Sequence, residues 1–559
     1  HSAEVFRLNR EAIKYFEQYF DYKFPFPKYD MVLIPEFPFG GMEHAGATFL
    51  RESSIIFPQE PTKNDHINRA LLMFHEASHQ WFGDTVTMRW FDDLWLKEGF
   101  ATFTAYKAME KIMPEMNAWK VFYERVKQAA YQTDSTKGTT PIYQEIPNLS
   151  AAKSAYGNIV YNKAPAFLRQ AEFYLGEDKF QTAVRAFLKK HEFGNAGWED
   201  LVRELEAASE QNLQEWANVW VLNRGLSNLS VGEIETFSPH IGVIKGQDIN
   251  YAISQRNALG ERPFWQQKSK TLIIDQGGSK QIRDLSLNVT KPIYGGKFIL
   301  SEKLSISRSN RFIFPNYQDY GYGIFLLDEK SRNYVLKNIQ NEKDPFLRSM
   351  MWGALWDSVR EGELDPREYV ELVVRVLSPA VLSSGFSRPS AAGKRPPEGG
   401  THSDDESTVA LLLNRVSTAM NYYLADEGGD LSGSEGAQRS IAPNSRTLPT
   451  GRVSALRERV ELVLIDRMRN AETLGQRITF YRAFLNIAAS DKARGVLKAM
   501  LRSEPPPSAS GSSRSTTPSA EAASTPPNQG GELGRIPLKV KDRFDIVTRL
   551  IILGDPDGL

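Results

Sequence analysis

Residues 75–101 read HEASHQWFGDTVTMRWFDDLWLKEGFA, and this stretch indicates how the surrounding helices pack. His75 and His79 lie four residues apart, so on an α-helix they share a face and can reach the same ion. Glu98 follows after eighteen intervening residues on a second helical stretch, which a helical hairpin would bring over the two histidines. A catalytic zinc site takes three protein ligands and keeps one open position. The stretch therefore predicts a zinc site on two packed helices, with Glu76 placed to accept a proton from a water molecule.

The length and composition of the chain bound its class. The 559 residues are too many for one core and favour two to four domains. The 68 basic and 68 acidic residues cancel, so the charge predicts neither nucleic acid nor an acidic membrane as a partner. No apolar run approaches the roughly 20 residues of a transmembrane segment. The chain has no cysteine, so His, Asp or Glu side chains must hold any metal ion.

Three regions differ in hydrophobic pattern and together predict a multidomain α+β protein. Residues 1–227 carry a short apolar strand and mostly helical spacing, including a helix for which Asp65 is a plausible N-cap. Residues 228–317 are short β-branched runs broken by Gly, Pro and Asn, typical of a small antiparallel β-sandwich. Residues 318–559 return to helical patterns and indicate a superhelix of helix pairs.

Three segments interrupt the last region, at 383–407, 427–451 and 503–531. They are rich in Ser, Pro and Gly and nearly free of large apolar residues. Such segments cannot bury enough apolar surface to offset the entropy lost on ordering. We therefore interpret them as disordered insertions.

A set of motifs resembles, in the same order, the aminopeptidase N family of zinc metallopeptidases (gluzincins). Besides residues 75–101, they are YDMVLIPEFPFGGMEH, SAYGNIVYNKA, WVLNRGL, FPNYQDYGYGIFLL and GALWDSVREGELDP. The resemblance covers most of the chain outside the three insertions. It implies a thermolysin-like catalytic domain at 1–227, a β-sandwich at 228–317, a helical superhelix at 318–559, and one Zn²⁺ per chain.

The N-terminal β domain that is typical of the family has no counterpart in this sequence. The chain also begins at His1 without an initiator Met or a signal peptide. We interpret it as a fragment or a processed form. The sequence therefore gives no localisation, and any signal or membrane anchor would lie before His1.

The resemblance assigns a role to each matched residue. It implies that Glu76 is the general base, that Tyr161 donates a hydrogen bond to the tetrahedral oxyanion, and that Glu43 binds the substrate's free α-amine. The other matched positions are the zinc ligands His75, His79 and Glu98 and the substrate-binding residues Gly40, Gly41, Met42 and His44. These roles agree with the chemistry, because zinc activates water and a carbonyl while a phenol stabilises developing negative charge. A buried carboxylate that faces an ammonium rejects substrates without that amine.

Two assignments leave alternatives open. Tyr156, five residues before Tyr161, competes for the oxyanion role. Asp92 and Asp93 fit the orientation of a zinc histidine or the capping of the second helix equally well.

Three positions depart from the pattern of the family. His44 stands where the family has Asn or a similar amide, and it adds a group that can gain charge near neutral pH. Lys97 stands where Asn is more usual, and we expect its side chain to point away from the metal. Ala164 and Pro165 stand where relatives tend to have Gly-Ala, and a proline near a helix start is tolerated.

The sequence leads to one main function and two alternatives. We expect a zinc aminopeptidase that releases N-terminal residues from peptides with a free α-amine, with no nucleic-acid partner. One alternative is an epoxide hydrolase with aminopeptidase activity, of the leukotriene-processing type, which shares a Gly-Gly-Met-Glu motif. The other is a relative that binds peptides without catalysis.

Overall fold

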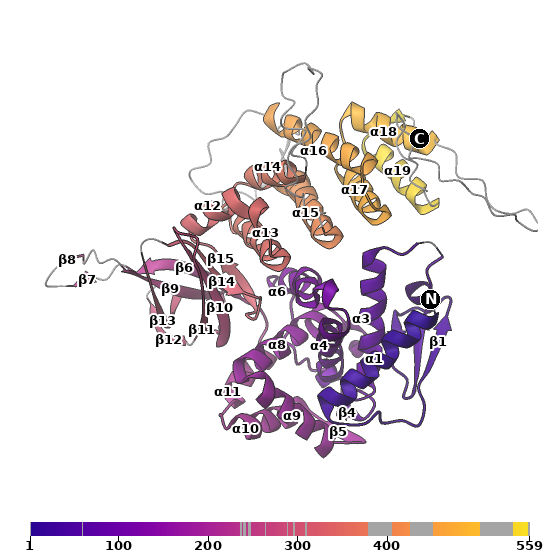
Figure 1. The fold of residues 1–559 in the computed structure, drawn as a ribbon, viewed down its shortest axis with the longest axis vertical. Coiled ribbons are helices and arrows are strands. Elements are labelled where there is room, and N and C mark those ends of the chain that lie inside the picture. The colour runs from indigo at the N-terminus through magenta and orange to yellow at the C-terminus, as the bar shows by residue number, and fades with distance from the viewer. Residues whose placement is uncertain are drawn as a thin grey trace, which may run out of the picture. The chain divides into compact units, whose positions relative to one another are not determined.

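The structure is a computed structural model, and Figure 1 shows its fold as a ribbon. The chain divides into two compact units, unit 1 at His1–Leu364 and unit 2 at Asp365–Leu559. The described residues are 2–58, 60–234, 237–238, 242–243, 248–262, 264–287, 289–293, 297–307, 310–377, 405–424, 451–502 and 540–556.

Unit 1 begins with an amphipathic helix and a small sheet. Helix α1 (Ser2–Phe20) buries one face that includes Leu8, Ala12 and Phe16. The sheet has the strand order β1-β3-β2, with the bounds β1 (Asp30–Ile34), β2 (Gly41–Met42) and β3 (Ala47–Arg51). Strand β1 runs parallel to β3, and β2 runs antiparallel to it. The GGMEH motif therefore starts on a strand that is fixed in register.

Helices α3 (Lys63–His79) and α4 (Leu94–Ile112) form the predicted hairpin. The predicted N-cap of α3, Asp65, is wrong by three residues, because the cap is Thr62. Asp65 is the third helical residue, and its carboxylate accepts a hydrogen bond of 2.8 Å from the Thr62 N–H. The Thr62 hydroxyl accepts one of 3.2 Å from the Asp65 N–H, which completes a capping box.

Polar and aromatic contacts hold the two helices of the hairpin together. The hydroxyl groups of Ser78 and Thr104 lie 2.6 Å apart in the buried interface. The rings of Phe82 and Phe100 stack with their centroids 4.1 Å apart. These contacts fix the register of α3 on α4, which determines where residues on facing turns meet.

Further helices surround the hairpin and complete a large apolar core that includes Trp81, Trp95 and Trp220. The elements up to residue 222 are α2 (Glu52–Ile55), β4 (Val86–Met88), α5 (Ala118–Val121), the π-helical η3 (Phe122–Lys127), α6 (Gln128–Asp134), α7 (Leu149–Ala155), the π-helical η4 (Ile159–Lys163), α8 (Ala164–Leu175), α9 (Glu177–Lys190), β5 (Gly194–Ala196), α10 (Trp198–Ser209) and α11 (Gln214–Leu222). Pro165 lies in the first turn of α8, as expected for a tolerated proline.

Two sheets follow, one of three strands in the order β11-β10-β14 and one of five in the order β12-β13-β9-β6-β15. An apolar cluster that includes Leu229, Ile253, Ile273 and Leu285 draws on strands of both sheets, so they pack on a shared core. The bounds are β6 (Ser227–Ile234), β9 (Asp248–Asn257), β10 (Gln267–Asp275), β11 (Lys280–Leu287), β12 (Val289–Ile293), β13 (Lys297–Ser307), β14 (Asn310–Tyr317) and β15 (Gly323–Leu326), with a short pair β7 (Phe237–Ser238) and β8 (Gly242–Val243).

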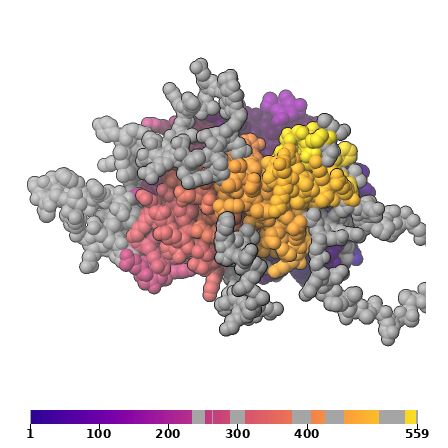
Figure 2. Space-filling view, turned by 90° about the horizontal axis from the view of Figure 1, so that it is seen from above, coloured from indigo at the N-terminus to yellow at the C-terminus, as the bar shows by residue number. Residues whose placement is uncertain are grey.

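Helices form the end of unit 1 and the described part of unit 2. They are α12 (Glu329–Asn338) and α13 (Pro345–Arg360) in unit 1, and α14 (Pro366–Leu377), α15 (Glu406–Thr418), α16 (Gly451–Arg469), α17 (Leu474–Ile487), α18 (Asp491–Arg502) and α19 (Val540–Ile552) in unit 2. In unit 2, α17 packs against α15, α16 and α19. The orange and yellow helices form one continuous packed surface in the space-filling view (Figure 2).

The structure confirms the mixed helical and sheet class. The predicted insertions at 383–407, 427–451 and 503–531 lie outside the described residues, apart from 405–407 and Gly451 at the starts of α15 and α16. The three-domain division at 1–227, 228–317 and 318–559 stays a prediction. None of the helices in the described part of the chain combines the length and apolar character that a membrane crossing requires.

Candidate metal centre

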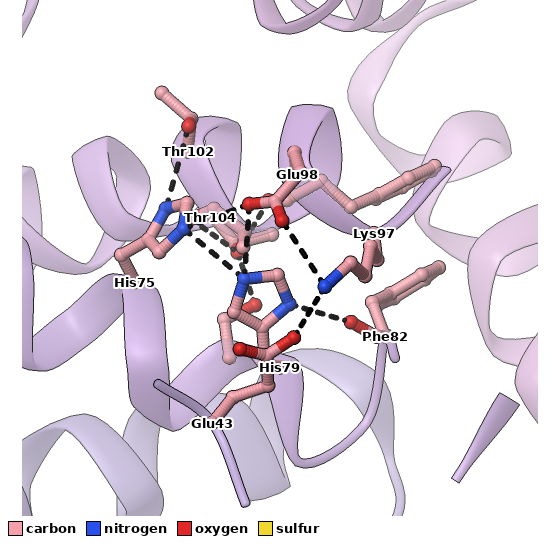
Figure 3. A network of polar contacts seen from close by, with 11 residues as sticks. Glu43, His75, His79, Phe82, Lys97, Glu98, Thr102 and Thr104 are labelled. Carbon is pink, nitrogen blue, oxygen red and sulfur yellow. Dashed lines mark hydrogen bonds and ion pairs between the residues drawn. The ribbon is translucent and has the colours of Figure 1, made fainter. Parts of the chain in front are cut away.

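Three predicted ligand atoms converge where α3 meets α4 (Figure 3). His75 Nε2 lies 3.2 Å from Glu98 Oε2, and His79 Nε2 lies 3.3 Å from the same oxygen. The two Nε2 atoms are 3.1 Å apart. Ligands on a tetrahedral zinc ion at about 2.0–2.1 Å are separated by roughly 3.3 Å. The triangle of ligand atoms therefore fits a zinc ion.

The other ring nitrogens of the two histidines contact groups that set their orientation. His79 Nδ1 lies 2.9 Å from the carbonyl oxygen of Phe82, and His75 Nδ1 lies 3.3 Å from the hydroxyl of Thr102. A hydrogen bond at Nδ1 leaves the Nε2 lone pair available for a metal ion. Phe82 could not be predicted from the sequence, because its backbone carbonyl rather than its side chain makes the contact.

Among the described residues, the side chains of Asp92 and Asp93 neither contact a zinc histidine nor cap the second helix. Asp92 accepts a hydrogen bond from the backbone N–H of Ile146 and one of 3.3 Å from the Tyr143 hydroxyl. Asp93 is the N-cap residue of α4 by position, but its side chain accepts no capping hydrogen bond. Thr102 and Phe82, and not these aspartates, contact the histidines.

Glu76 lies on α3 directly against the glycine strand. A Cβ atom placed on Gly41 would lie 2.3 Å from Glu76 Oε1, so only glycine fits there. Gly40 is less constrained, since its Cβ would meet only Leu72 Cδ1 at 3.3 Å. The Glu76 side chain is 5 % exposed, and burial raises the pKa of Glu76 to about 8. The paired glycines thus give the carboxylate its place next to the cluster.

The segment that carries Glu43 is pinned by a glutamine that the sequence reasoning missed. Gln80 follows the second histidine, and its Nε2 donates to the carbonyl of Glu43 at 3.2 Å. Gln80 Oε1 accepts a hydrogen bond of 2.8 Å from the N–H of Gly46. The available sequence signal was its position one residue after a ligand, on the same helix. Gln80 therefore ties the backbone of Glu43 to the helix that carries both histidines.

The remaining motif residues line up along β2 and β3. Met42 pairs with Phe49 in the antiparallel register. The ring of His44 lies edge-on to Phe49, with centroids 4.6 Å apart. His44 follows Glu43 in the chain. Among the described residues, its ring packs on Phe49 and not on the three ligand atoms.

Lys97 does not point away from the cluster, which corrects the expectation from the sequence. Its Nζ lies 2.5 Å from Glu43 Oε1 and 3.1 Å from Glu98 Oε1 (Figure 3). Neighbouring helical residues point in different directions, but the long lysine side chain reaches both carboxylates. Lys97 therefore links the proposed amine-binding glutamate to a proposed metal ligand.

The electrostatics of the cluster favour an additional cation. Burial opposes ionisation of Glu43, but His79 and Lys97 outweigh it and lower the pKa of Glu43 to about 2. Burial also opposes protonation of His79, yet Glu43 and Glu98 raise the pKa of His79 to about 9. Burial raises the pKa of Asp84 to about 7. The raised pKa of His79 shows that Glu43 and Glu98 attract positive charge to this nitrogen cluster, and a divalent metal ion would supply that charge in place of the proton.

The structure brings Tyr161 beside His75, with ring centroids 6.1 Å apart. Burial, reinforced by the negative charge of Glu98, raises the pKa of Tyr161, so its hydroxyl stays protonated and can donate. Tyr156 is 40 % exposed, and its ring lies 6.2 Å from that of Tyr161. Of the two tyrosines, Tyr161 is the one whose ring lies beside His75, a predicted metal ligand.

Tyr161 lies on η4, which is held from both sides. A Cβ on Gly99, next to Glu98, would lie 2.9 Å from the Cβ of Ala164, so α4 closely approaches the start of α8, directly after η4. On the other side, Lys163 Nζ lies 2.9 Å from Asp134 Oδ2 and donates to the carbonyl of Gly225 at 2.9 Å. Tyr161 thus lies between the hairpin of α3 and α4 and the buried ion pair of Lys163 with Asp134.

Fold and site together define the class: an α+β protein with a candidate metal centre of two histidines and a glutamate on a helical hairpin. Residues 5–220 match the family described as the peptidase family M1 domain. This match and the relatives below confirm the resemblance to the aminopeptidase N family.

Several curated proteins are similar to the chain. Aminopeptidase N of Streptomyces lividans is 32% identical over 382 residues, which cover 66% of this chain and 43% of that protein. Probable aminopeptidase 1 of Sulfurisphaera tokodaii is 34% identical over 60% of this chain and 44% of its own length. Puromycin-sensitive aminopeptidase of Caenorhabditis elegans is 35% identical over 40% of this chain and 24% of its own length. The chain thus spans less than half the length of each of these relatives.

Proposed function

We propose that the chain is the catalytic part of a zinc aminopeptidase that hydrolyses the N-terminal bond of peptides. The observation that carries this proposal is the convergence of His75 Nε2, His79 Nε2 and Glu98 Oε2 at 3.1–3.3 Å beside Glu76 and Glu43. The similar proteins of Streptomyces lividans and Sulfurisphaera tokodaii are named as aminopeptidases, which supports the same activity. The same resemblance supports a thermolysin-like domain, a β-sandwich and a helical superhelix as its architecture.

The residues of the chain divide the reaction between them. His75, His79 and Glu98 would hold Zn²⁺, which when bound would polarise the scissile carbonyl and acidify water. Glu76 accepts a proton from the attacking water and passes it to the leaving amine. Tyr161 donates a hydrogen bond to the oxyanion, and removing such a donor typically lowers the rate about 10²–10³-fold.

Glu43 would restrict the site to peptides with a free α-amine. Its carboxylate is largely buried, with 13 % of the side chain exposed, so it stays ionised only with cationic partners. A substrate ammonium would supply such a partner, and an N-acetylated peptide would not. The alternatives, an epoxide hydrolase or a non-catalytic peptide binder, find no separate support in the contacts of the described residues.

The test is hydrolysis by the zinc-loaded chain and by its Glu76→Gln variant. Leucine p-nitroanilide should be cleaved and N-acetyl-leucine p-nitroanilide should not. Glu76→Gln should retain one zinc ion per chain, measured by mass spectrometry, while the rate falls at least about 10²-fold because the proton acceptor is lost. Glu11→Gln, an exposed glutamate of α1, is the matched control and should behave as the wild type.

Each part of the proposal has its own contradicting result. Equal cleavage of the acetylated substrate would remove the amine-binding role of Glu43. Loss of zinc in Glu76→Gln would mean that the ligand set differs from His75, His79 and Glu98. Retained zinc and amine-dependent peptide binding without turnover would favour the non-catalytic alternative.

A further inference from the structure

Lys97 places an ammonium group where the proposed function needs the ammonium of a substrate. Its Nζ donates a hydrogen bond of 2.5 Å to Glu43 Oε1, and 14 % of the lysine side chain is exposed. The pair is thus mostly shielded from solvent, where an ion pair is screened less than at the surface. A substrate α-ammonium that approaches Glu43 therefore meets a carboxylate that already has a cationic partner.

The contact between Lys97 and Glu98 is compatible with a bound metal. Lys97 lies on Glu98 Oε1, whereas the two histidines face Glu98 Oε2. One oxygen of the carboxylate is thus directed to the metal site and the other to the lysine. Metal binding through Oε2 leaves the lysine contact in place, so Lys97 keeps its position beside Glu43 in the loaded protein.

A displaced Lys97 also has a second place to go. Its Nζ lies 5.9 Å from the centroid of the Tyr156 ring, within the range of a cation–π contact. Tyr156 is 40 % exposed, so the ring that Lys97 faces lies at the surface. A lysine displaced from Glu43 would therefore keep an aromatic partner at the edge of the site.

We propose that Lys97 is a specificity-determining residue, an internal ammonium that occupies the amine site at Glu43 and that a substrate must displace. The proposal rests on the proposed function and adds a competitor to it. A ligand with an α-amine binds by exchanging one ammonium for another, so it gains less than it would at a vacant carboxylate. A ligand without the amine leaves the Lys97–Glu43 pair intact. Lys97 thus reduces the discrimination between free and missing α-amines.

The test compares two ligands that differ only in the α-amine. L-leucine hydroxamate and 4-methylpentanohydroxamic acid carry the same zinc-binding group, and their dissociation constants are measured by calorimetry on the zinc-loaded full chain. The quantity of interest is the ratio of the two constants in each protein. Lys97→Asn should raise the preference for the amine about tenfold, since a charge-assisted hydrogen bond no longer has to be broken. Lys97→Arg keeps the cation and should retain the preference of the wild type.

Controls separate this role from a structural one. Lys111→Asn replaces an exposed lysine of the same helix and should leave both constants unchanged. Zinc content and melting temperature are measured for every variant. In the background of Glu43→Gln, the substitution Lys97→Asn should no longer change the ratio, because the effect acts through Glu43.

Each outcome decides between the two proposals. If the wild type prefers the amine and Lys97→Asn leaves the ratio unchanged or lowers it, the competitor role is overturned and the proposed function stands. Equal weakening of both ligands, or loss of zinc in Lys97→Asn, assigns the lysine to support of Glu98 and also overturns it. If neither protein prefers the amine, Glu43 is no amine site, and both proposals fail together.

Discussion

Unit 1 contains two kinds of buried charged cluster, and they are built differently. Around the hairpin of α3 and α4, one cluster brings together Glu43, Glu76, Glu98, Lys97 and the two histidines, and Lys97 and both histidines contact the same carboxylate, Glu98. Elsewhere in unit 1, two fully buried lysines each pair with one aspartate. One such pair is Lys163 with Asp134. The second is Lys127 with Asp319, at 3.0 Å.

The paired lysines also donate to backbone carbonyls, whereas Lys97 in the hairpin cluster lies on two carboxylates. Lys127 Nζ donates to the carbonyls of Asp319 and Gly321, at 2.8 and 2.6 Å. In the hairpin cluster, burial leaves Glu76 with a pKa raised to about 8. Burial also lowers the pKa of Lys127 to about 8, so the shared carboxylate, and not a shifted pKa, distinguishes the hairpin cluster from the pairs. The comparison predicts stability losses from one kind of cluster and metal-dependent effects from the other.

The largest expected effect comes from breaking a balanced pair. Asp134→Ala removes the partner of Lys163 and also the acceptor for the N–H of Gly225 and the hydroxyl of Tyr322. Leaving a buried lysine uncompensated should lower the free energy of unfolding by about 3–5 kcal/mol. Urea unfolding, monitored by tryptophan fluorescence, measures this loss. Glu11→Ala, which breaks an exposed pair with Arg7, should cost below about 1 kcal/mol.

A smaller effect is expected from the metal. Because the folded cluster would bind Zn²⁺ and the unfolded chain would not, zinc at 100 times its dissociation constant should stabilise the protein by about 2.7 kcal/mol. The melting temperature should rise with zinc and fall again with EDTA. His79→Ala should abolish the response, and a response that persists in this variant would place the zinc elsewhere.

The smallest effect, taken per pH unit, concerns Asp93, a buried carboxyl outside both clusters. Its Oδ1 has no hydrogen-bond partner among the described residues, and burial, reinforced by Glu199, raises its pKa to about 7. Between the usual value and pH 7 the unfolded chain is ionised there while the folded chain holds a proton, so stability falls as pH rises. Above pH 7 the contribution is constant. Asp93→Asn should remove a slope of at most about 1.4 kcal/mol per pH unit.

Denaturation of the wild type and of Asp93→Asn at a series of pH values measures this slope. Parallel curves for the two proteins across pH 4 to 7 would mean that Asp93 is as well compensated as the paired aspartates. Asp93 would then belong with the paired aspartates.

Much of the candidate site could be predicted because its spacing is local. The four-residue step from His75 to His79 and the approach of Glu98 depend only on helix geometry and one hairpin, and the structure brings these three residues together. Lys97 could not be predicted this way. Its partner Glu43 is 54 residues distant in the sequence, and helix direction alone does not say where a long flexible side chain ends.

The sheets show the same limit at the level of the fold. Short β-branched runs predicted strands between 228 and 317, but β15 lies at Gly323–Leu326 and pairs in parallel with β6. That pairing is decided by tertiary contacts rather than by the local pattern. Likewise, η4 is π-helical, so the facing of Tyr161 could not be read from a regular helical repeat.

The close approach of Gly99 to Ala164 has a consequence for how such sites diverge. Glu98 and Tyr161 lie on two segments of the chain that meet where the methyl group of Ala164 approaches Gly99. The size of residue 164 therefore sets the distance between the segment of Glu98, the proposed metal ligand, and the segment of Tyr161, the proposed hydrogen-bond donor. A single methyl group, added or removed at residue 164, changes that spacing while both chemical groups stay the same.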